Sequence, residues 1–259
     1  MNILILAESL RINETSSGIV SSTFIKALSN NKQNKITCVY DKVFNYDITW
    51  LEECNLVVLE KSNYKTNLFI NKIPKLKGLL AAINGINVDV KNEVNRWRDA
   101  IEKQLIVNNF DLIITLGSGI AFYPFYAMLE INTDVKWLAN FHDPFPMSVY
   151  PEPYKKKRNI FLKRQEHSAN KIIQKANFLS FPSLYLKELM QEKYPFEDSK
   201  SIILPHIGIA LDNLPSSGLD NEVNLSENKF NLLHAGTLLG PRKVESLFNA
   251  FRKFLSSDK

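Results

Sequence analysis

In Trp137-Leu-Ala-Asn-Phe-His142-Asp143-Pro144-Phe-Pro146, a predicted β-strand runs directly into two titratable side chains. The segment 135–141 is mostly apolar and rich in strand-forming residues. Pro144 lacks a backbone donor and disfavours helix in the residue before it, so the strand must end at His142 and Asp143. Because ligands bind at the carboxyl edge of open α/β sheets, both side chains are candidates for a functional site. A loop histidine followed by an ordinary Asp-Pro turn explains the same residues.

Six further apolar segments are typical of buried strands, and segments with helical spacing separate them. Strands are predicted at 2–7, 35–40, 55–59, 110–116, 135–141, 177–181 and 201–204. Helices are predicted at 19–28, 94–107, 120–130, 155–175 and 183–193. This alternation predicts an α/β fold with a parallel sheet covered on both faces. The run Lys155–Arg158 is interpreted as the solvated face of the helix that would begin there.

Small residues close two of these strands before a helix begins. Ser16-Ser17-Gly18 ends the loop after the first strand, and Gly117-Ser118-Gly119 follows the fourth. Backbone N–H groups at such a helix start can bind an anion. An N-cap by Ser16 or Ser17 explains the first turn equally well. Neither turn carries the three glycines of a dinucleotide-binding fingerprint, which argues against a nicotinamide-dependent enzyme.

The totals indicate a globular protein with a mild basic bias. The 259 residues are 45% hydrophobic and carry a formal charge of +5, which suits an anionic ligand, a nucleic acid or a membrane surface. Cys38 and Cys54 lack metal-type spacing, so neither a disulfide scaffold nor a zinc site is expected. The start MNILILAESL has no cationic residues and is predicted to be a strand, not a signal peptide. We therefore expect a cytoplasmic location, with attachment to the inner face of a membrane left open.

The composition changes at 205–228, where proline, glycine and serine gather before a polar, acidic stretch. This segment is predicted to link a first domain, 1–204, to the first strand and helix of a second α/β domain, 229–259. One strand and one helix cannot form a core, and the helix predicted at 242–255 has an apolar stripe that needs a partner. The second domain is therefore expected to be truncated, or its first unit to dock on the first domain.

Three groups of residues, taken in order, resemble known landmarks. The first is the strand ending in His142-Asp143. The second runs from Arg164-Gln-Glu166 through Ala176-Asn177 and Ser183 to Ile203-Leu-Pro205-His206-Ile-Gly208. The third is Leu232-Leu-His234-Ala-Gly236-Thr-Leu, followed by Arg242 and then Ala250-Phe251. In this order and spacing the chain resembles the N-terminal domain of a GT-B glycosyltransferase of family four, the group 1 type. The resemblance implies a Rossmann-like first domain.

The resemblance also implies an activity. The full protein would transfer a sugar, with retention of configuration, from a nucleotide-sugar donor to a saccharide or lipid-linked acceptor in glycan or polysaccharide biosynthesis. Neither a metal nor a further cofactor is expected. Residue by residue, His142 would contact the transferred sugar, Arg242 would clamp the diphosphate, and backbone near Gly18, Gly236 and Thr237 would bind the donor. Ser17 and Asp143 would support these groups.

The sequence departs from the family pattern in four places. Thr237 stands where the family often has an arginine, Ser17-Gly18 replaces a glycine pair, and His206 replaces the hinge asparagine. The family's second acidic motif, which holds the donor, would lie beyond Lys259. The chain by itself is therefore predicted to be catalytically inactive.

A non-catalytic α/β module that binds a nucleotide or a partner remains the alternative. No nucleic-acid partner is expected, because no basic stripe with exposed aromatic residues stands out. The basic segments Lys65–Lys77 and Lys155–Arg164 would suit an anionic membrane leaflet. His206 and His234 are interpreted as structural, and Glu166 as a partner in a helix salt bridge.

Overall fold

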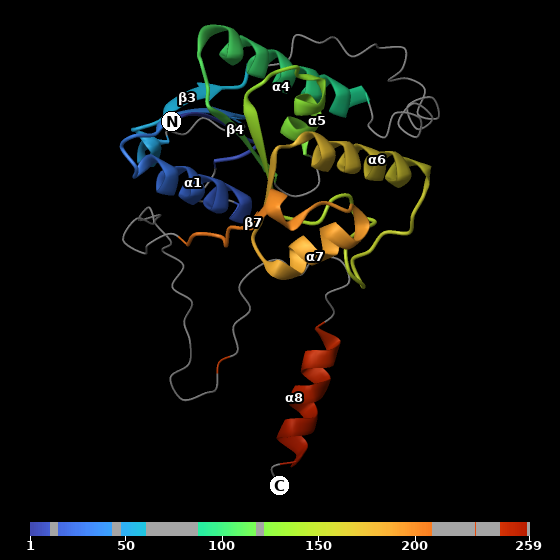
Figure 1. The fold of residues 1–259 in the computed structure, drawn as a ribbon. Coiled ribbons are helices and arrows are strands. Elements are labelled where there is room, and N and C mark those ends of the chain that lie inside the picture. Colours follow the sequence, from blue (N-terminus) through green and yellow to red (C-terminus); the bar gives the residue numbers. More distant parts are fainter. Residues whose placement is uncertain are drawn as a thin grey trace.

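The computed structural model describes residues 1–10, 15–42, 48–60, 88–117, 122–208, 231 and 244–257. Its centre is one seven-stranded sheet in which every neighbouring pair of strands is parallel, in the order β3-β2-β1-β4-β5-β6-β7 (Figure 1). The strands are β1 Asn2–Ala7, β2 Lys35–Tyr40, β3 Asn55–Val58, β4 Leu112–Gly117, β5 Lys136–Phe141, β6 Phe178–Phe181 and β7 Ser201–Ile203. The predicted α/β fold and the seven strands predicted within residues 1–204 are confirmed.

The strand β1 lies between β2 and β4, so the order of strands reverses beside it. Ile3 pairs with Ile36 of β2 on one side and with Leu112 of β4 on the other. At the amino ends of β1 and β4, the backbone N–H of Asn2 donates to a carboxylate oxygen of Asp111 at 2.7 Å. In sheets of this kind the carboxyl ends of the strands at the reversal flank a crevice where ligands bind.

Helices cover both faces of the sheet, as the all-apolar strands require. The structure describes six α-helices and two short 3₁₀ turns. These are α1 Ser16–Ser29, η1 Thr49–Leu51, α4 Val88–Val107, α5 Tyr123–Glu130, α6 Ile160–Lys175, α7 Leu184–Lys193, η2 Asp198–Lys200 and α8 Glu245–Ser257. Buried side chains of α4, α5, α6 and α7 share one core with one face of the strands. Those of α1 and η1 share a second core with the opposite face.

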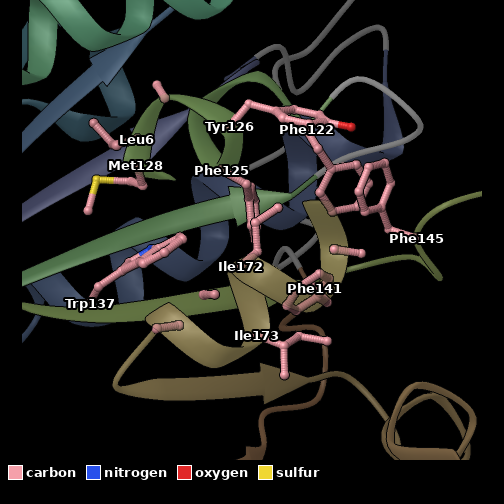
Figure 2. Close-up of a cluster of buried hydrophobic side chains, with 14 of the residues drawn as sticks. Leu6, Phe122, Phe125, Tyr126, Met128, Trp137, Phe141, Phe145, Ile172 and Ile173 are labelled. Carbon is pink, nitrogen blue, oxygen red and sulfur yellow. The ribbon is translucent and has the colours of Figure 1, made fainter. Parts of the chain in front are cut away.

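An aromatic cluster fills the first core near the carboxyl ends of β4 and β5 (Figure 2). Phe122 stacks on Phe145 with ring centroids 4.2 Å apart and meets Phe125 edge-on at 5.0 Å. Phe122 also has a left-handed backbone, with φ of 52°, which costs an L-residue on the order of 1–2 kcal/mol. A side chain at Gly117 would place its Cβ 2.8 Å from a ring carbon of Phe122. The end of β4 therefore needs glycine so that these rings can pack.

Two lysine side chains bind the carboxyl-terminal ends of the covering helices α5 and α6. The ammonium of Lys175, at the end of α6, donates to the carbonyl oxygens of Met128, Leu129 and Ile131 at 2.6–3.2 Å. These carbonyls close the last turn of α5, where no intrahelical donor remains for them. In the same way, the ammonium of Lys200 in η2 donates to the carbonyl oxygens of Ile173 and Gln174, in the last turn of α6, at 2.6 and 3.1 Å.

The predicted start of α6 is wrong. The helix begins at Ile160, and its N-cap is Asn159, whose side chain accepts from the backbone N–H of Leu162 at 2.9 Å. The run Lys155–Arg158 precedes the helix and is not its solvated face. Electrostatics explains the difference, because the positive end of a helix macrodipole disfavours cations in the first turn.

The first helix also starts earlier than predicted. The N-cap of α1 is Thr15, whose hydroxyl accepts from the backbone N–H of Gly18 at 3.0 Å. Ser16 and Ser17 therefore lie inside the first turn, and neither is the cap. Likewise α4 begins at Val88 rather than at residue 94.

In the second predicted domain the structure describes Asn231 and 244–257. The helix α8 stands apart from the sheet (Figure 1) and has no buried residue. Its side chains Leu247, Phe248, Phe254 and Leu255 are more than half exposed. The apolar stripe that the sequence predicted is present and has no cover within the part of the chain that the structure describes. The strand predicted at 229–235 and most of the linker lie outside that part.

Candidate functional site

His142 lies where the sequence predicted, directly after β5 and at the carboxyl edge of the sheet. The neighbouring strands β4 and β6 place this edge in the middle of the sheet, not at its margin. The imidazole is largely enclosed, and its Nδ1 is buried without a hydrogen-bond partner among the described residues. A buried polar atom left unpaired lowers the free energy of unfolding by roughly 1–3 kcal/mol. A contribution to stability therefore does not explain the position of His142.

The segment after β7 brings a second histidine to this edge. The ring of His206 meets the ring of His142 edge-on, with centroids 5.2 Å apart. The hydroxyl of Thr23 in α1 donates to the carbonyl oxygen of Ile207 at 2.8 Å and so fixes this segment across the edge of the sheet. His206 is exposed. It belongs to the candidate site, although its sequence context suggested a structural role.

Burial sets the protonation state of His142. Removal of the ring from water lowers the pKa of His142 from 6.5 to about 4, and the nearby His206 adds to this effect. The imidazole is therefore neutral at pH 7. A neutral imidazole donates from one ring nitrogen and accepts at the other, which suits contact with a hydroxyl group.

Asp143 acts on a different neighbour. Burial and the carboxylate of Asp143 together raise the pKa of Tyr150 to about 12. Tyr150 is therefore electrostatically coupled to Asp143, the residue that follows His142 in the chain. The sequence offered no signal for Tyr150, which stands in the proline-rich loop that follows the strand.

The two helix starts that were considered as anion sites are capped by side chains of the chain itself. The backbone N–H of Gly18 already donates to Thr15, and Gly18 is buried while Ser17 is half-buried. At the start of α5, the backbone N–H of Tyr123 donates to a carboxylate oxygen of Glu8 at 2.8 Å. Glu8 follows β1, so this carboxylate lies at the reversal of strand order and takes the position open to a ligand anion.

Two further buried side-chain oxygens lie near this edge, in β5 and β6. Asn140 of β5 pairs in register with Ser180 of β6, and both residues are buried. The side-chain oxygens Oδ1 of Asn140 and Oγ of Ser180 have no hydrogen-bond partner in the described parts of the chain. The sequence did not mark either residue as a site residue, because each lies within a predominantly apolar strand.

Glu166 is an ion-pair partner, as predicted, but its partners come from outside its own helix. Its carboxylate is 5% exposed and lies 2.5 Å from Arg158 and 3.5 Å from Lys193 of α7. The hydroxyl of Ser148 also donates to it at 2.7 Å. Burial opposes ionisation most strongly, yet the hydrogen bonds from Ser148 and Arg158 and the charge of Lys193 outweigh it and lower the pKa of Glu166.

The predicted donor-binding residues Gly236, Thr237 and Arg242 lie outside the described residues, as does His234. So does the basic segment Lys65–Lys77. Where the structure describes the chain, no three His, Cys, Asp or Glu side chains gather in a way that could hold a metal ion. Both cysteines are free and buried. None of the described helices is long and apolar enough to cross a membrane.

Comparison with solved structures finds low-identity matches to this chain, among them the following three proteins. A glycosyltransferase from Rickettsia africae matches with 15% identity and a TM-score of 0.42, over 97% of this chain and 49% of its own. The apo form of the lipopolysaccharide outer core galactosyltransferase WaaB matches with 13% identity and a TM-score of 0.43, over 79% and 45%. MurG from Acinetobacter baumannii matches with 7% identity and a TM-score of 0.39, over 80% and 46%.

This chain therefore spans about half the length of the solved structures that it matches. No protein-family model matches the chain, and no curated protein matches it by sequence.

Proposed function

We propose that the chain is the acceptor-side half, with the beginning of the donor-side half, of a retaining GT-B glycosyltransferase of family four. In this proposal 1–204 is the first domain, 205–228 is the linker and 229–259 begins the second domain. The observation that carries the proposal is the position of His142 at the carboxyl edge of β5 in a parallel sheet of order β3-β2-β1-β4-β5-β6-β7. The motifs in the sequence supply the family.

In the proposed mechanism the protein contributes positioning and electrostatics. The neutral ring of His142 holds a hydroxyl of the transferred sugar, and the ring of His206 meets it edge-on. Negative charge develops on the departing diphosphate, and Arg242 stabilises it through bidentate hydrogen bonds. Loss of one such donor costs on the order of 3 kcal/mol of transition-state stabilisation. Backbone near Gly236 and Thr237 adds contacts to the phosphates.

Thermal unfolding tests the donor part of the proposal. A chain extended through a complete second α/β domain is melted with and without a panel of nucleoside diphosphates. A ligand present at 100 times its Kd stabilises the native state by roughly 2.7 kcal/mol. We expect one nucleotide to raise Tm, and Arg242→Ala to abolish the shift. Arg252→Ala, on the exposed face of α8, is the matched control. No shift with any nucleotide contradicts the proposal.

Sugar transfer tests the role of His142. In the extended chain, His142→Ala should lower kcat by about 10²–10³-fold, the range for loss of one positioned polar group. His167→Ala, an exposed histidine of α6, should leave kcat unchanged. The 259-residue chain alone should transfer no sugar, because a GT-B site lies between two domains. Transfer by that chain would contradict the proposed division of the site.

One observation favours the alternative of a non-catalytic nucleotide- or partner-binding module. Side chains of the protein already occupy both helix starts at the crevice, through Thr15 on Gly18 and Glu8 on Tyr123. Nucleotide binding by the extended chain without transfer to any acceptor would support this module.

A further inference from the structure

The loop after β5, together with Glu166 of α6 and residues of α7, lines a charged cavity of about 680 Å³, here called the basic cavity. A volume of this size is typical of small-molecule sites. Cationic side chains outnumber acidic ones in its wall. The cationic residues are Lys155, Lys156, Lys157, Arg158 and Lys193, and the acidic residues are Glu152, Glu166 and Glu192.

Much of this positive charge is not neutralised by the protein. Glu166 binds Arg158 and Lys193. No acidic side chain among the described residues lies within ion-pair distance of the three exposed lysines, Lys155, Lys156 and Lys157. These lysines also precede the N-terminus of the 16-residue helix α6, whose first turn contains no acidic residue. Cations at that end of a helix are unfavourable. A bound anion would therefore relieve both the repulsion among the three lysines and the repulsion between these lysines and the helix macrodipole.

A second cavity of about 550 Å³, here called the aromatic cavity, adjoins the first. Its wall is mostly apolar and comes from α4, α5, α6 and the loop after β5. The apolar and aromatic residues are Val90, Tyr123, Tyr126, Pro144, Phe145, Met147, Phe161 and Leu162. Several of these side chains, including Tyr123, Met147 and Phe161, are only half-buried. An apolar ligand group that covered them would remove that surface from water.

Lys156 and Lys157 line both cavities. The backbone N–H of Lys156 donates to the carbonyl oxygen of Met147 at 3.2 Å, which fixes the shared wall to the loop after β5. Lysine presents an apolar stem below its charged end, so one side chain can face both surroundings. The aromatic cavity also lies near the carboxyl end of β5, because Pro144 and Phe145, which line it, follow His142 and Asp143 directly.

We propose that these two cavities bind one amphiphile, with its phosphate head group among Lys155, Lys156 and Lys157 and its hydrocarbon chain in the aromatic cavity. Charge complementarity selects the head group, and the apolar wall selects the chain. One part of this inference, that the amphiphile is the acceptor of the transferred sugar, rests on the proposed function. Its binding is measured without any nucleotide.

Farnesyl monophosphate, inorganic phosphate and farnesol are the probes, each titrated calorimetrically into the 259-residue chain below its micelle concentration. Both halves of the site must be filled for tight binding. We therefore expect the Kd of farnesyl monophosphate to be at least 10-fold lower than that of either fragment. Equal affinity for farnesol, or for inorganic phosphate, would overturn the proposal.

Variants distinguish the contributions of the two cavities to binding. Lys156→Gln with Lys157→Gln should raise the Kd of farnesyl monophosphate at least 10-fold, whereas Lys163→Gln, an exposed lysine of α6 outside both cavities, should not. Glu192→Gln removes a negative charge from the basic cavity and should lower the Kd. Phe161→Ser should weaken binding of farnesyl monophosphate and leave that of inorganic phosphate unchanged. An equal loss in Lys163→Gln, or weaker binding in Glu192→Gln, would overturn the proposal.

A membrane surface is the competing partner, and vesicles distinguish it. Co-sedimentation with anionic vesicles in the absence of binding to monomeric farnesyl monophosphate would overturn the amphiphile site. The amphiphile site and the donor part of the proposed function can also be contradicted independently of each other. A nucleotide-induced shift in Tm without farnesyl monophosphate binding contradicts only the amphiphile site. Farnesyl monophosphate binding without any nucleotide shift supports that site and contradicts the donor part of the proposed function.

Discussion

His142 is held neutral by its surroundings, and this has a consequence for stability. Its pKa is lowered from 6.5 to about 4 in the folded chain, so protonation favours the unfolded state. The stability is complete above about pH 6.5 and falls as the pH drops towards 4, by on the order of 3 kcal/mol. In His142→Gln this loss should be absent. Chemical denaturation of both proteins between pH 4 and 7 measures it, and parallel curves would contradict the expectation.

Gly117 permits the closest approach in the aromatic cluster. In Gly117→Ala the new Cβ would lie 2.8 Å from Phe122 and 3.0 Å from Phe125, and overpacking of this kind costs about 1–3 kcal/mol. Gly208→Ala is the matched control, because nothing lies within 4 Å of its Cβ, and it should change stability by less than about 0.5 kcal/mol. Urea denaturation measures both. Equal midpoints for the two variants would show that the ring of Phe122 yields without cost.

Single residues of the site were predictable to different degrees. His142 was found because a strand ending before a proline is a local pattern. His206 was not assigned to the site, because its contact depends on where the chain turns after β7, and the hydrogen bond from Thr23 that fixes this turn joins residues 184 positions apart. The same holds for Glu8, whose partner Tyr123 is 115 positions away. Such pairs follow from the order of strands and not from spacing along the chain.

Among the elements, α5 and α6 depend on lysines that lie beyond their ends. Lys175→Met would leave three carbonyls at the end of α5 without a cation and should cost about 1 kcal/mol. Lys171→Met, an exposed change in the last turns of α6, is the control and should be nearly neutral. Thermal unfolding of both variants measures the difference. Equal Tm values would mean that water replaces the ammonium of Lys175 without loss.

Helix starts were the weakest part of the sequence analysis, whereas the strands predicted within residues 1–204 lay close to the observed strands. Strands such as β1 are marked by continuous apolar runs, which have clear ends. Helix starts depend on which of several capping residues is used. Hydrogen bonds that a sequence pattern does not rank select Thr15 over Ser16 or Ser17 as the cap of α1, and start α6 after Asn159 instead of at Lys155.

Considered as a whole, the described chain combines a buried sheet with a helix that contributes nothing to its core. An isolated helix as short as the 13 residues of α8 is marginally stable in water. We expect amides of α8 to exchange with solvent fastest among the helices that the structure describes, and those of β1, β4 and β5 to exchange slowest. Hydrogen exchange followed by mass spectrometry measures this. Protection of α8 equal to that of α6 would show that another surface covers its apolar stripe.

The position of β1 between β2 and β4 also governs how the chain folds during synthesis. Asn2 and Asp111, which join the starts of β1 and β4, are separated by 109 positions. A ribosome that adds about 5–20 residues each second needs roughly 5–20 s to travel that distance. Throughout this interval one edge of β1 has no strand to pair with, and an unpaired edge promotes association with other chains. The step most vulnerable to aggregation therefore comes early in translation, and chaperone binding to the nascent chain should be greatest before β4 emerges.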